Sequence, residues 1–290
     1  MNRSIFLLFV FVGFISCYSF CQQSDNKQSV TLKGSIRDSE SKLPLAYASV
    51  GVLNMPYGTV ADSLGVYSFY VEQYSENDSI QVSMVGYFTE RITILDLIKS
   101  SGKEILLKKQ PVMLQEVTVS NKEMKTEVIG RESSGKFVQV SLHKKGAAQE
   151  TVGSEFGIKM STEHAAILKD FNWLISGNNF KSIKLRLNIY SVKDNLPDTL
   201  ICKQQIFVTL KKYQTGWNRI ELEDYDIAVK GEFIVTLQWL EGVTDNDKNP
   251  VTLIPVAMTP FSRNCYARVA SQDKWTRLKS KPSFYATILY

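Results

Sequence analysis

Short segments in which apolar and polar residues alternate dominate the chain after residue 30. Val30, Leu32 and Ile36 alternate with polar neighbours, and further segments of this kind cover 46–53, 66–71, 80–85, 90–94 and 105–107. Turn residues separate them at intervals of about 8–12 residues, which is typical of antiparallel sandwiches. Asp62 and Gly65 form one such turn signal, because glycine accepts a positive φ and aspartate hydrogen-bonds the turn backbone. We therefore expect an all-β first domain.

Four motifs in this part of the chain occur in a recognisable order. They are GSIRD at 34–38, PLAYASV at 44–50, GTVADSLGVYSF at 58–69 and VSMVGY at 82–87. In this order and spacing they resemble the carboxypeptidase-like regulatory domain (CarboxypepD_reg-like) family of bacterial secreted and envelope proteins. The resemblance implies a seven-stranded-type Greek-key β-sandwich, similar to transthyretin, over 30–110. It also implies export, and it implies no reaction, because the family name refers to an accessory domain of carboxypeptidases.

The second half of the chain shows longer alternating segments. Residues 183–190 and 233–240 each have one apolar and one mixed face, and 199–210, 251–256, 265–270 and 284–290 also read as strands. This pattern indicates two packed sheets. We expect a larger antiparallel, jelly-roll-like β-sandwich over 151–290. A small outer-membrane β-barrel following a periplasmic regulatory-like domain is the alternative, since the chain ends on an aromatic residue and about 140 residues could form eight strands.

The N-terminus has the pattern of a secretory signal peptide. One positive charge precedes an apolar run from Ile5 to Ile15, which is too short to span a bilayer. Small residues before Gln22 predict a signal peptide over 1–21, followed by a polar linker over 22–29. A poor lipobox ending at Cys17 is the alternative, and it would make Cys17 a lipidated N-terminus. Residues 111–150 are charged and rich in Gly, Ser and Lys, and we interpret them as a connector with one strand-like piece.

Composition excludes some classes of function. Among 290 residues the formal net charge is +5, which we take to be spread along the chain as a solvated surface. Together with export, this argues against nucleic acid as a partner. The size of the chain suffices for two domains.

Residue patterns for catalysis or metal binding are weak. The chain has two histidines, His143 and His164, which we interpret as surface residues, and a catalytic zinc site needs three closely arranged ligands. No Gly-x-Ser-x-Gly motif is present. The acidic stretch 221–226 and the polar stretch 245–249 are better explained as turns than as a glycosidase pair or a calcium loop. We predict no enzyme activity, no metal and no cofactor.

Two residue types, tryptophan and cysteine, provide the remaining candidates. Sugars dock on exposed aromatic faces with polar rims, and Trp275 lies in the polar stretch 271–277, so it is our candidate ligand-binding residue. Trp239 follows an apolar face and is expected in the core, while Trp173 and Trp217 fit either core or rim. Cys202 and Cys265 could form a disulfide in an oxidising compartment, or remain two buried thiols.

These observations together predict a non-catalytic secreted or envelope-attached accessory or scaffold protein that presents a binding surface. A carbohydrate-binding module is the runner-up. The expected partner is an envelope protein or a glycan, with an association with the outer membrane as a further option, and the expected location is the periplasm, the outer membrane or the extracellular space.

Overall fold

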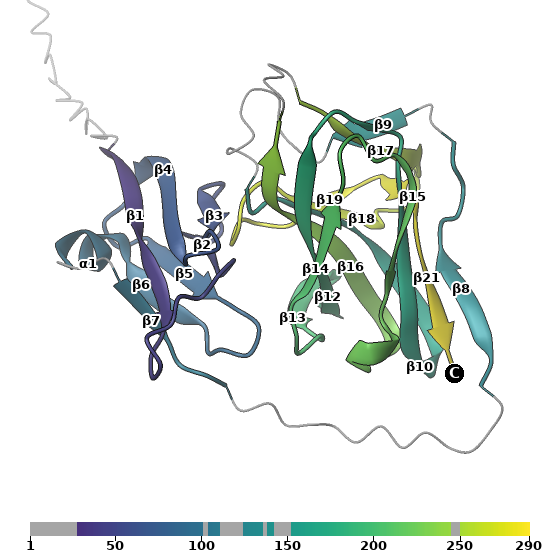
Figure 1. Ribbon diagram of the computed structural model, residues 1–290, viewed down its shortest axis with the longest axis horizontal. Coiled ribbons are helices and arrows are strands. Elements are labelled where there is room, and N and C mark those ends of the chain that lie inside the picture. The colour runs from purple at the N-terminus through teal and green to yellow at the C-terminus, as the bar shows by residue number, and fades with distance from the viewer. Residues whose placement is uncertain (1–27, 101–103, 111–123, 136–137, 142–151, 245–249) are drawn as a thin grey trace, which may run out of the picture.

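The computed structural model describes residues 28–100, 104–110, 124–135, 138–141, 152–244 and 250–290. Strands make up 62% of the structure and helices 4%, so the predicted all-β class is confirmed. Figure 1 shows two β-sandwiches side by side, the first coloured purple to blue and the second teal to yellow. The predicted signal peptide, most of the predicted linker and Cys17 lie outside the described residues.

Seven of the described strands form the first sandwich, arranged in two sheets. In one sheet β1 (Gln28–Asp38) lies between β4 (Val66–Tyr74) and β7 (Glu104–Leu107). The other sheet has the order β3 (Gly58–Val60), β2 (Ser49–Val52), β5 (Ser79–Ser83) and β6 (Glu90–Thr93). Pairing is antiparallel except between β1 and β7, which are parallel. The short helix α1 (Ile94–Lys99) lies at the end remote from the second sandwich (Figure 1).

The core of the first sandwich follows the alternation in the sequence. Leu32 and Ile36 of β1 face Val50, Ile80 and other apolar side chains of the opposite sheet, and all are buried. The Asp62–Gly65 turn has the predicted geometry. The Asp62 Oδ1 atom accepts hydrogen bonds from the backbone N–H groups of Leu64 (2.8 Å) and Val66 (2.9 Å), and Gly65 has a φ of 74°.

The second sandwich is built around one ten-stranded sheet. Its main path runs β13 (Leu196–Leu200), β12 (Ser182–Lys193), β16 (Ala228–Val243), β10 (Glu155–Ile175), β18 (Cys265–Arg268) and β19 (Thr276–Leu278). Further strands extend it: β14 (Ile206–Leu210) pairs with β12, β15 (Gly216–Glu221) and β21 (Phe284–Leu289) pair with β10, and β8 (Thr126–Gly130) pairs with β21. A four-stranded sheet contains β11 (Gly177–Asn178), β17 (Thr252–Met258), β20 (Ser280–Pro282) and β9 (Val138–Ser141).

Strand β10 holds the second sandwich together. Its first part pairs with β16 and β18, and its last part pairs with β15 and β21. The register with β16 shifts between Thr162 and Ala166, and the register with β21 shifts between Leu168 and Asp170. Because such irregularities bend a strand, one strand of 21 residues can serve two regions of the sheet. The main apolar cluster, with Trp173, Trp239 and Phe284, lies among these strands.

The structure differs from the sequence analysis in several elements. Residues 111–150, expected to be a connector with one strand-like piece, contribute two strands, β8 and β9, which pair with β21 and β17 of the second sandwich. The single strand expected over 199–210 is two strands, β13 and β14, and the 3-10 helix Glu223–Tyr225 occupies the acidic stretch. Among the described residues no helix has the length and apolarity needed to cross a membrane.

Candidate binding cleft between the two sandwiches

Strands β12 and β16 each have two different faces. The apolar residues of β12, such as Leu187 and Ile189, point into the core of the second sandwich. The alternate residues Arg186, Asn188 and Tyr190 form a polar face, and this face is buried as well. The mixed face that the sequence predicted is therefore not solvated.

Four polar residues lie opposite one another across four neighbouring strands. Arg186 of β12 is paired in register with Gln238 of β16, Gln238 with Glu155 of β10, and Glu155 with Arg268 of β18. Directly opposite residues in a sheet have side chains close enough to interact. The register therefore produces one continuous polar row, with an arginine at each end and a carboxylate between them.

Glu155 is the centre of this row. Its carboxylate accepts hydrogen bonds from Tyr190 Oη (3.0 Å) and Thr236 Oγ1 (3.1 Å), and also from Asn188 Nδ2 and the Arg268 guanidinium. Burial acts to lower the pKa of Arg268, but Glu155, Tyr190 and Asp273 together outweigh burial, so the pKa lies above its ordinary value. Burial and the same carboxylate raise the pKa of Tyr190. A buried carboxylate with this many donors is held in one geometry.

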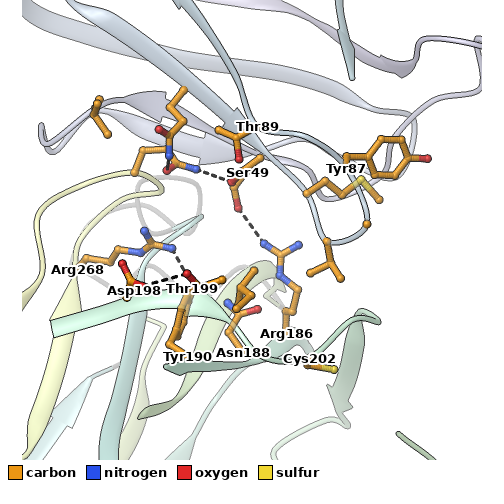
Figure 2. Close-up of a pocket in the computed structure, with 18 of the residues that line it drawn as sticks. Ser49, Tyr87, Thr89, Arg186, Asn188, Tyr190, Asp198, Thr199, Cys202 and Arg268 are labelled. Atoms are coloured by element: carbon orange, nitrogen blue, oxygen red, sulfur yellow. Dashed lines mark hydrogen bonds between the residues drawn. The ribbon is translucent and has the colours of Figure 1, made fainter. Parts of the chain in front are cut away.

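Arg186 connects the row to the first sandwich. Its Nη1 atom donates to the backbone carbonyl of Tyr47 (2.9 Å) and to Gln205 Oε1 (3.1 Å). Its Nη2 atom donates to Ser49 Oγ (2.9 Å) and Gln238, and its Nε atom also donates to Gln238. Figure 2 shows the guanidinium extending to Ser49. Burial lowers the pKa of Arg186, and Glu155 partly offsets that effect.

The ring of Tyr47 forms a second contact across the boundary. Tyr47 Oη donates to Glu241 Oε1 (2.7 Å) and accepts from Lys184 Nζ (2.6 Å). Lys184 Nζ also lies 4.2 Å from the centroid of the Tyr47 ring, and Phe207 packs edge-on at 5.3 Å. Burial raises the pKa of Tyr47. Tyr47 has a φ of 60°, and the contacts on both sides hold this uncommon conformation.

The loop between β18 and β19 makes a third contact with the first sandwich. Gln272 Nε2 donates to Ser83 Oγ (2.8 Å), Gln272 Oε1 accepts from Gln81 Nε2 (2.7 Å), and the Gln272 carbonyl accepts from the backbone of Asn54 (2.9 Å). A Cβ atom on Gly51 would lie 2.2 Å from the backbone oxygen of Ser271. The close approach of these two backbones requires glycine.

A cleft of about 720 Å³ lies between the two sandwiches beside these contacts. Its walls include Gln81, Thr89 and Tyr87 from the first sandwich, and Asn188, Tyr190, Asp198, Thr199, Arg268 and Trp275 from the second. Figure 2 shows Tyr190, Asn188 and Arg186 rising from the β12 side toward Ser49 and Thr89 opposite. The lining thus combines hydrogen-bonding groups and aromatic rings contributed by both sandwiches.

Trp275, the sequence-predicted ligand-binding residue, lies in this cleft. It is half-buried rather than an open platform. Its ring packs edge-on against Tyr190, with ring centroids 5.7 Å apart, and the Arg268 guanidinium carbon lies 4.6 Å from its centroid. Trp173 and Trp239 are buried in the core, whereas Trp217 is 39% exposed and packs against Tyr285.

The remaining sequence candidates take no part in a reactive arrangement in the described residues. Cys202 and Cys265 are both free, buried thiols there, so the disulfide raised above is not formed in the structure. Burial raises the pKa of Cys202 and raises that of Cys265 to about 12, which keeps both protonated. His164 stacks on Tyr290 with ring centroids 4.1 Å apart. His143 and the polar stretch 245–249 lie outside the described residues.

Metal-binding clusters are likewise not found in the part of the chain that the structure describes. There, no group of three or more His, Cys, Asp or Glu side chains is placed to hold a metal ion.

Sequence reasoning missed the residues that build the floor of the cleft. Glu155, Asn188, Gln238 and Arg268 are distant in sequence and meet only through the register of four strands. The one sequence feature that pointed to these residues was the polar face of 184–190. A polar face of this kind does not by itself reveal that another domain covers it.

Comparison with known proteins identifies the first sandwich. Residues 32–119 match the family model of the CarboxypepD_reg-like domain, as the four motifs predicted. No curated protein matches the chain.

Among solved structures the likeness is remote. Over 90% of its length the chain is similar to the cysteine protease and lectin-like domains of Cwp84, a surface layer associated protein of Clostridium difficile, with 10% identity and a TM-score of 0.38. The chain spans 58% of that structure's chain. A second structure of clostridial Cwp84, after propeptide cleavage, gives 10% identity and a TM-score of 0.40 over 89% of this chain and 70% of the other. Sequence identities and TM-scores this low support no inference from Cwp84 to this protein.

Proposed function

We propose that this protein, whose residues 32–119 form a CarboxypepD_reg-like domain, is a non-catalytic accessory protein that binds a glycan in the cleft between its two sandwiches. The CarboxypepD_reg-like domain is non-catalytic in itself and fits an accessory or binding role. Its family is typical of exported proteins, which supports a site of action at the cell envelope.

One observation carries the proposal: a pre-formed cleft of about 720 Å³ that is lined from both sides by hydrogen-bonding side chains and has Trp275 in its wall. This volume is in the range of small-ligand sites, about 300–1,000 Å³. The two sandwiches are fixed to each other by Arg186, Tyr47 and Gln272, so the walls need little rearrangement on binding.

The lining favours a sugar over an apolar ligand. Asn188, Thr199 and Gln81 can donate and accept hydrogen bonds, as sugar hydroxyl groups require, and the half-buried Trp275 ring adds apolar surface for sugar C–H groups. Charges of both signs line the cleft, among them Arg268 and Asp273. A neutral, hydroxyl-rich chain suits such a mixed lining.

The proposal is tested with a panel of defined oligosaccharides (β-1,4-glucan, chitin-type, xylan and mannan fragments) on a glycan array, followed by calorimetric titration of the best binder. The matched variants are Trp275→Ala and Trp217→Ala. Trp217 is partly exposed but does not line the cleft. We expect Trp275→Ala to weaken binding by up to about tenfold, because an aromatic contact contributes about 0.5–1.5 kcal/mol, and Trp217→Ala to bind like the wild type.

Two results would contradict the proposal. Equal loss of affinity in both variants would place the glycan elsewhere or indicate general unfolding, which thermal unfolding curves distinguish. Retention of no glycan, together with capture of a single envelope protein by crosslinks through the cleft residues, would replace the glycan with a protein partner.

A further inference from the structure

The net charge of the protein is concentrated at its C-terminal end. Of the 34 basic and 29 acidic residues in the chain, six and one respectively lie within 251–290, so the first 250 residues contain 28 of each. The even spread of charge expected above is therefore wrong, and the whole surplus of +5 belongs to the last forty residues. The single acidic residue in this stretch is Asp273, which lies at the cleft.

Four of the six basic residues gather around one turn. The turn spans Thr259–Ser262, where the Ser262 backbone N–H donates to the Thr259 carbonyl (3.2 Å) and Thr259 Oγ1 donates to the Ser262 carbonyl (2.9 Å). The basic residues reach this turn from two directions. Arg263 follows the turn directly, and Arg277, Lys279 and Lys281 come from the returning segment.

The pairing of strands fixes these neighbours. The Thr259 backbone N–H donates to the Lys279 carbonyl (2.9 Å), and Lys281 is paired in register with Ala257. Arg277 Nη2 is 3.4 Å from the Arg263 carbonyl. We call the set Met258–Arg263 with Arg277, Lys279 and Lys281 the basic turn.

The tip of the basic turn is apolar. The Phe261 side chain is fully exposed, with a relative exposure of 102%, and Met258 is 61% exposed. Thr259 and Pro260 precede Phe261, and a proline at the second position of a turn fixes the backbone there. A fully exposed phenylalanine on a rigid turn has no role in the core of this protein.

The basic side chains of the turn have no acidic partners in the described residues. The ion pairs found there involve other arginines and lysines, such as Arg219 with Asp170 and Lys159 with Glu232, and none includes Arg263, Arg277, Lys279 or Lys281. The positive charge of the turn is thus available to an external anion.

We propose that the basic turn is a membrane-contact site that docks the protein on an anionic lipid bilayer, with Phe261 in the headgroup region and the surrounding basic residues against lipid phosphates. An aromatic residue suits the membrane interface, and basic residues near an anionic surface each strengthen attachment about fivefold. The inference rests on the charge distribution and the turn, and it is independent of the glycan in the cleft.

The experiment is co-sedimentation of the full chain with vesicles made of equal parts phosphatidylglycerol and phosphatidylethanolamine, compared with vesicles of phosphatidylcholine alone. We expect the wild-type protein to bind the anionic vesicles more tightly, and to lose binding between about 0.1 M and about 0.5 M salt because salt screens charges. Phe261→Ser should weaken binding about tenfold, as the apolar tip no longer inserts. The double variant Lys279→Gln/Lys281→Gln should weaken it about 25-fold.

Matched controls separate this site from a general effect. Lys33→Gln/Lys230→Gln removes the same charge from exposed positions in other parts of the fold, and Leu64→Ser removes a side chain that is 68% exposed on the first sandwich. Both should bind like the wild type. The proposal is overturned if the wild type binds the two vesicle types equally, if it binds neither, if the controls lose as much affinity as the turn variants, or if Phe261→Ser binds unchanged, which would indicate a general polyanion surface instead.

Discussion

The guanidinium of Arg186 in the second sandwich donates a hydrogen bond of 2.9 Å to Ser49 Oγ in the first. The same side chain reaches the Tyr47 carbonyl at 2.9 Å and ends a polar row that begins at Arg268. The CarboxypepD_reg-like domain is therefore a fixed wall of the cleft rather than a tethered appendage. The two sandwiches share one buried polar layer, and changes to that layer should affect both.

Replacing Arg186 should loosen the two sandwiches from each other. Arg186→Met keeps an unbranched stem but removes the guanidinium donor from Ser49 Oγ, the Tyr47 carbonyl and Gln238 Oε1. Buried polar groups that lose their partner cost about 1–3 kcal/mol, so we expect the free energy of unfolding to fall by about 2 kcal/mol. Chemical denaturation measures this change, and limited proteolysis should show earlier cleavage between the domains.

The control for this prediction is Arg37→Met, which removes an exposed ion pair with Glu104 within the first sandwich. Such pairs contribute about 0–1 kcal/mol. If Arg186→Met were as mild as Arg37→Met, the polar row would not join the domains.

A single methyl group should disturb the same boundary. In Gly51→Ala the new Cβ atom would lie 2.2 Å from the Ser271 backbone oxygen, and backbone cannot rotate away as a flexible side chain can. We expect a loss of about 2–3 kcal/mol, at the upper end of overpacking effects. Gly135→Ala is the matched control, since its nearest atoms would lie at ordinary contact distances of 3.6 and 3.7 Å. Small-angle scattering should show expansion for Gly51→Ala alone.

Much of the fold could be predicted from the sequence, because both sandwiches have strands with one apolar face. The strands β1, β4 and β12 were found from their alternation. Strand β10 was missed since much of Glu155–Ile175 is buried on both faces, which removes the alternation that marks a half-exposed strand. Strand β9 (Val138–Ser141) coincides with the strand-like piece expected in the charged stretch 111–150, whereas β8 was missed because its mostly exposed residues give little apolar signal.

The cleft could be predicted only at Trp275. A tryptophan in a polar stretch is an unusual local feature, and it can be recognised from the sequence alone. The partners of Glu155 come from strands that begin more than 25 residues apart in the chain, and only the register brings them together. The role of Gly51 was equally invisible, because its constraint comes from Ser271 in the other sandwich.

Acid should destabilise the first sandwich through Asp38. Backbone N–H donation from Ser41 is the main cause that lowers the pKa of Asp38; burial opposes it, and Glu40 and Tyr87 add to it. Because the carboxyl is more acidic in the folded state, its contribution to stability is present above the ordinary value of 3.8 and is lost as the pH falls below it. Asp38→Asn should therefore lower the unfolding temperature at pH 7, and this deficit should shrink progressively as the pH falls from 3.8 toward 2.

Thermal unfolding of both proteins across this pH range checks the sign. The exposed Glu72→Gln on β4 serves as the control, since it removes one carboxylate without the turn contacts. A deficit of Asp38→Asn that stayed constant from pH 7 to pH 2 would show that the charge of Asp38 does not matter.

Two buried tyrosines should respond in opposite directions to loss of the hydroxyl group. Tyr67 is 2% exposed, and its hydroxyl has no hydrogen-bond partner among the described residues. Tyr67→Phe removes an unsatisfied buried polar group, so we expect it to stabilise the protein by about 1 kcal/mol. Tyr190→Phe instead removes a donor from the buried Glu155 carboxylate and should destabilise by about 2 kcal/mol, since bonds to charged groups are the stronger ones.

The two variants make the same chemical change, loss of a hydroxyl group, at two sites. They test whether the Tyr190 hydroxyl stabilises the buried polar layer while the Tyr67 hydroxyl does not stabilise the fold. Because Tyr67 and Tyr190 belong to different sandwiches and lie in different apolar clusters, their effects should add in the double variant. Denaturant titration of the three proteins measures this. Destabilisation by Tyr67→Phe would reveal a partner for its hydroxyl, whereas a neutral Tyr190→Phe would mean that the remaining donors to Glu155 suffice to hold the floor of the cleft.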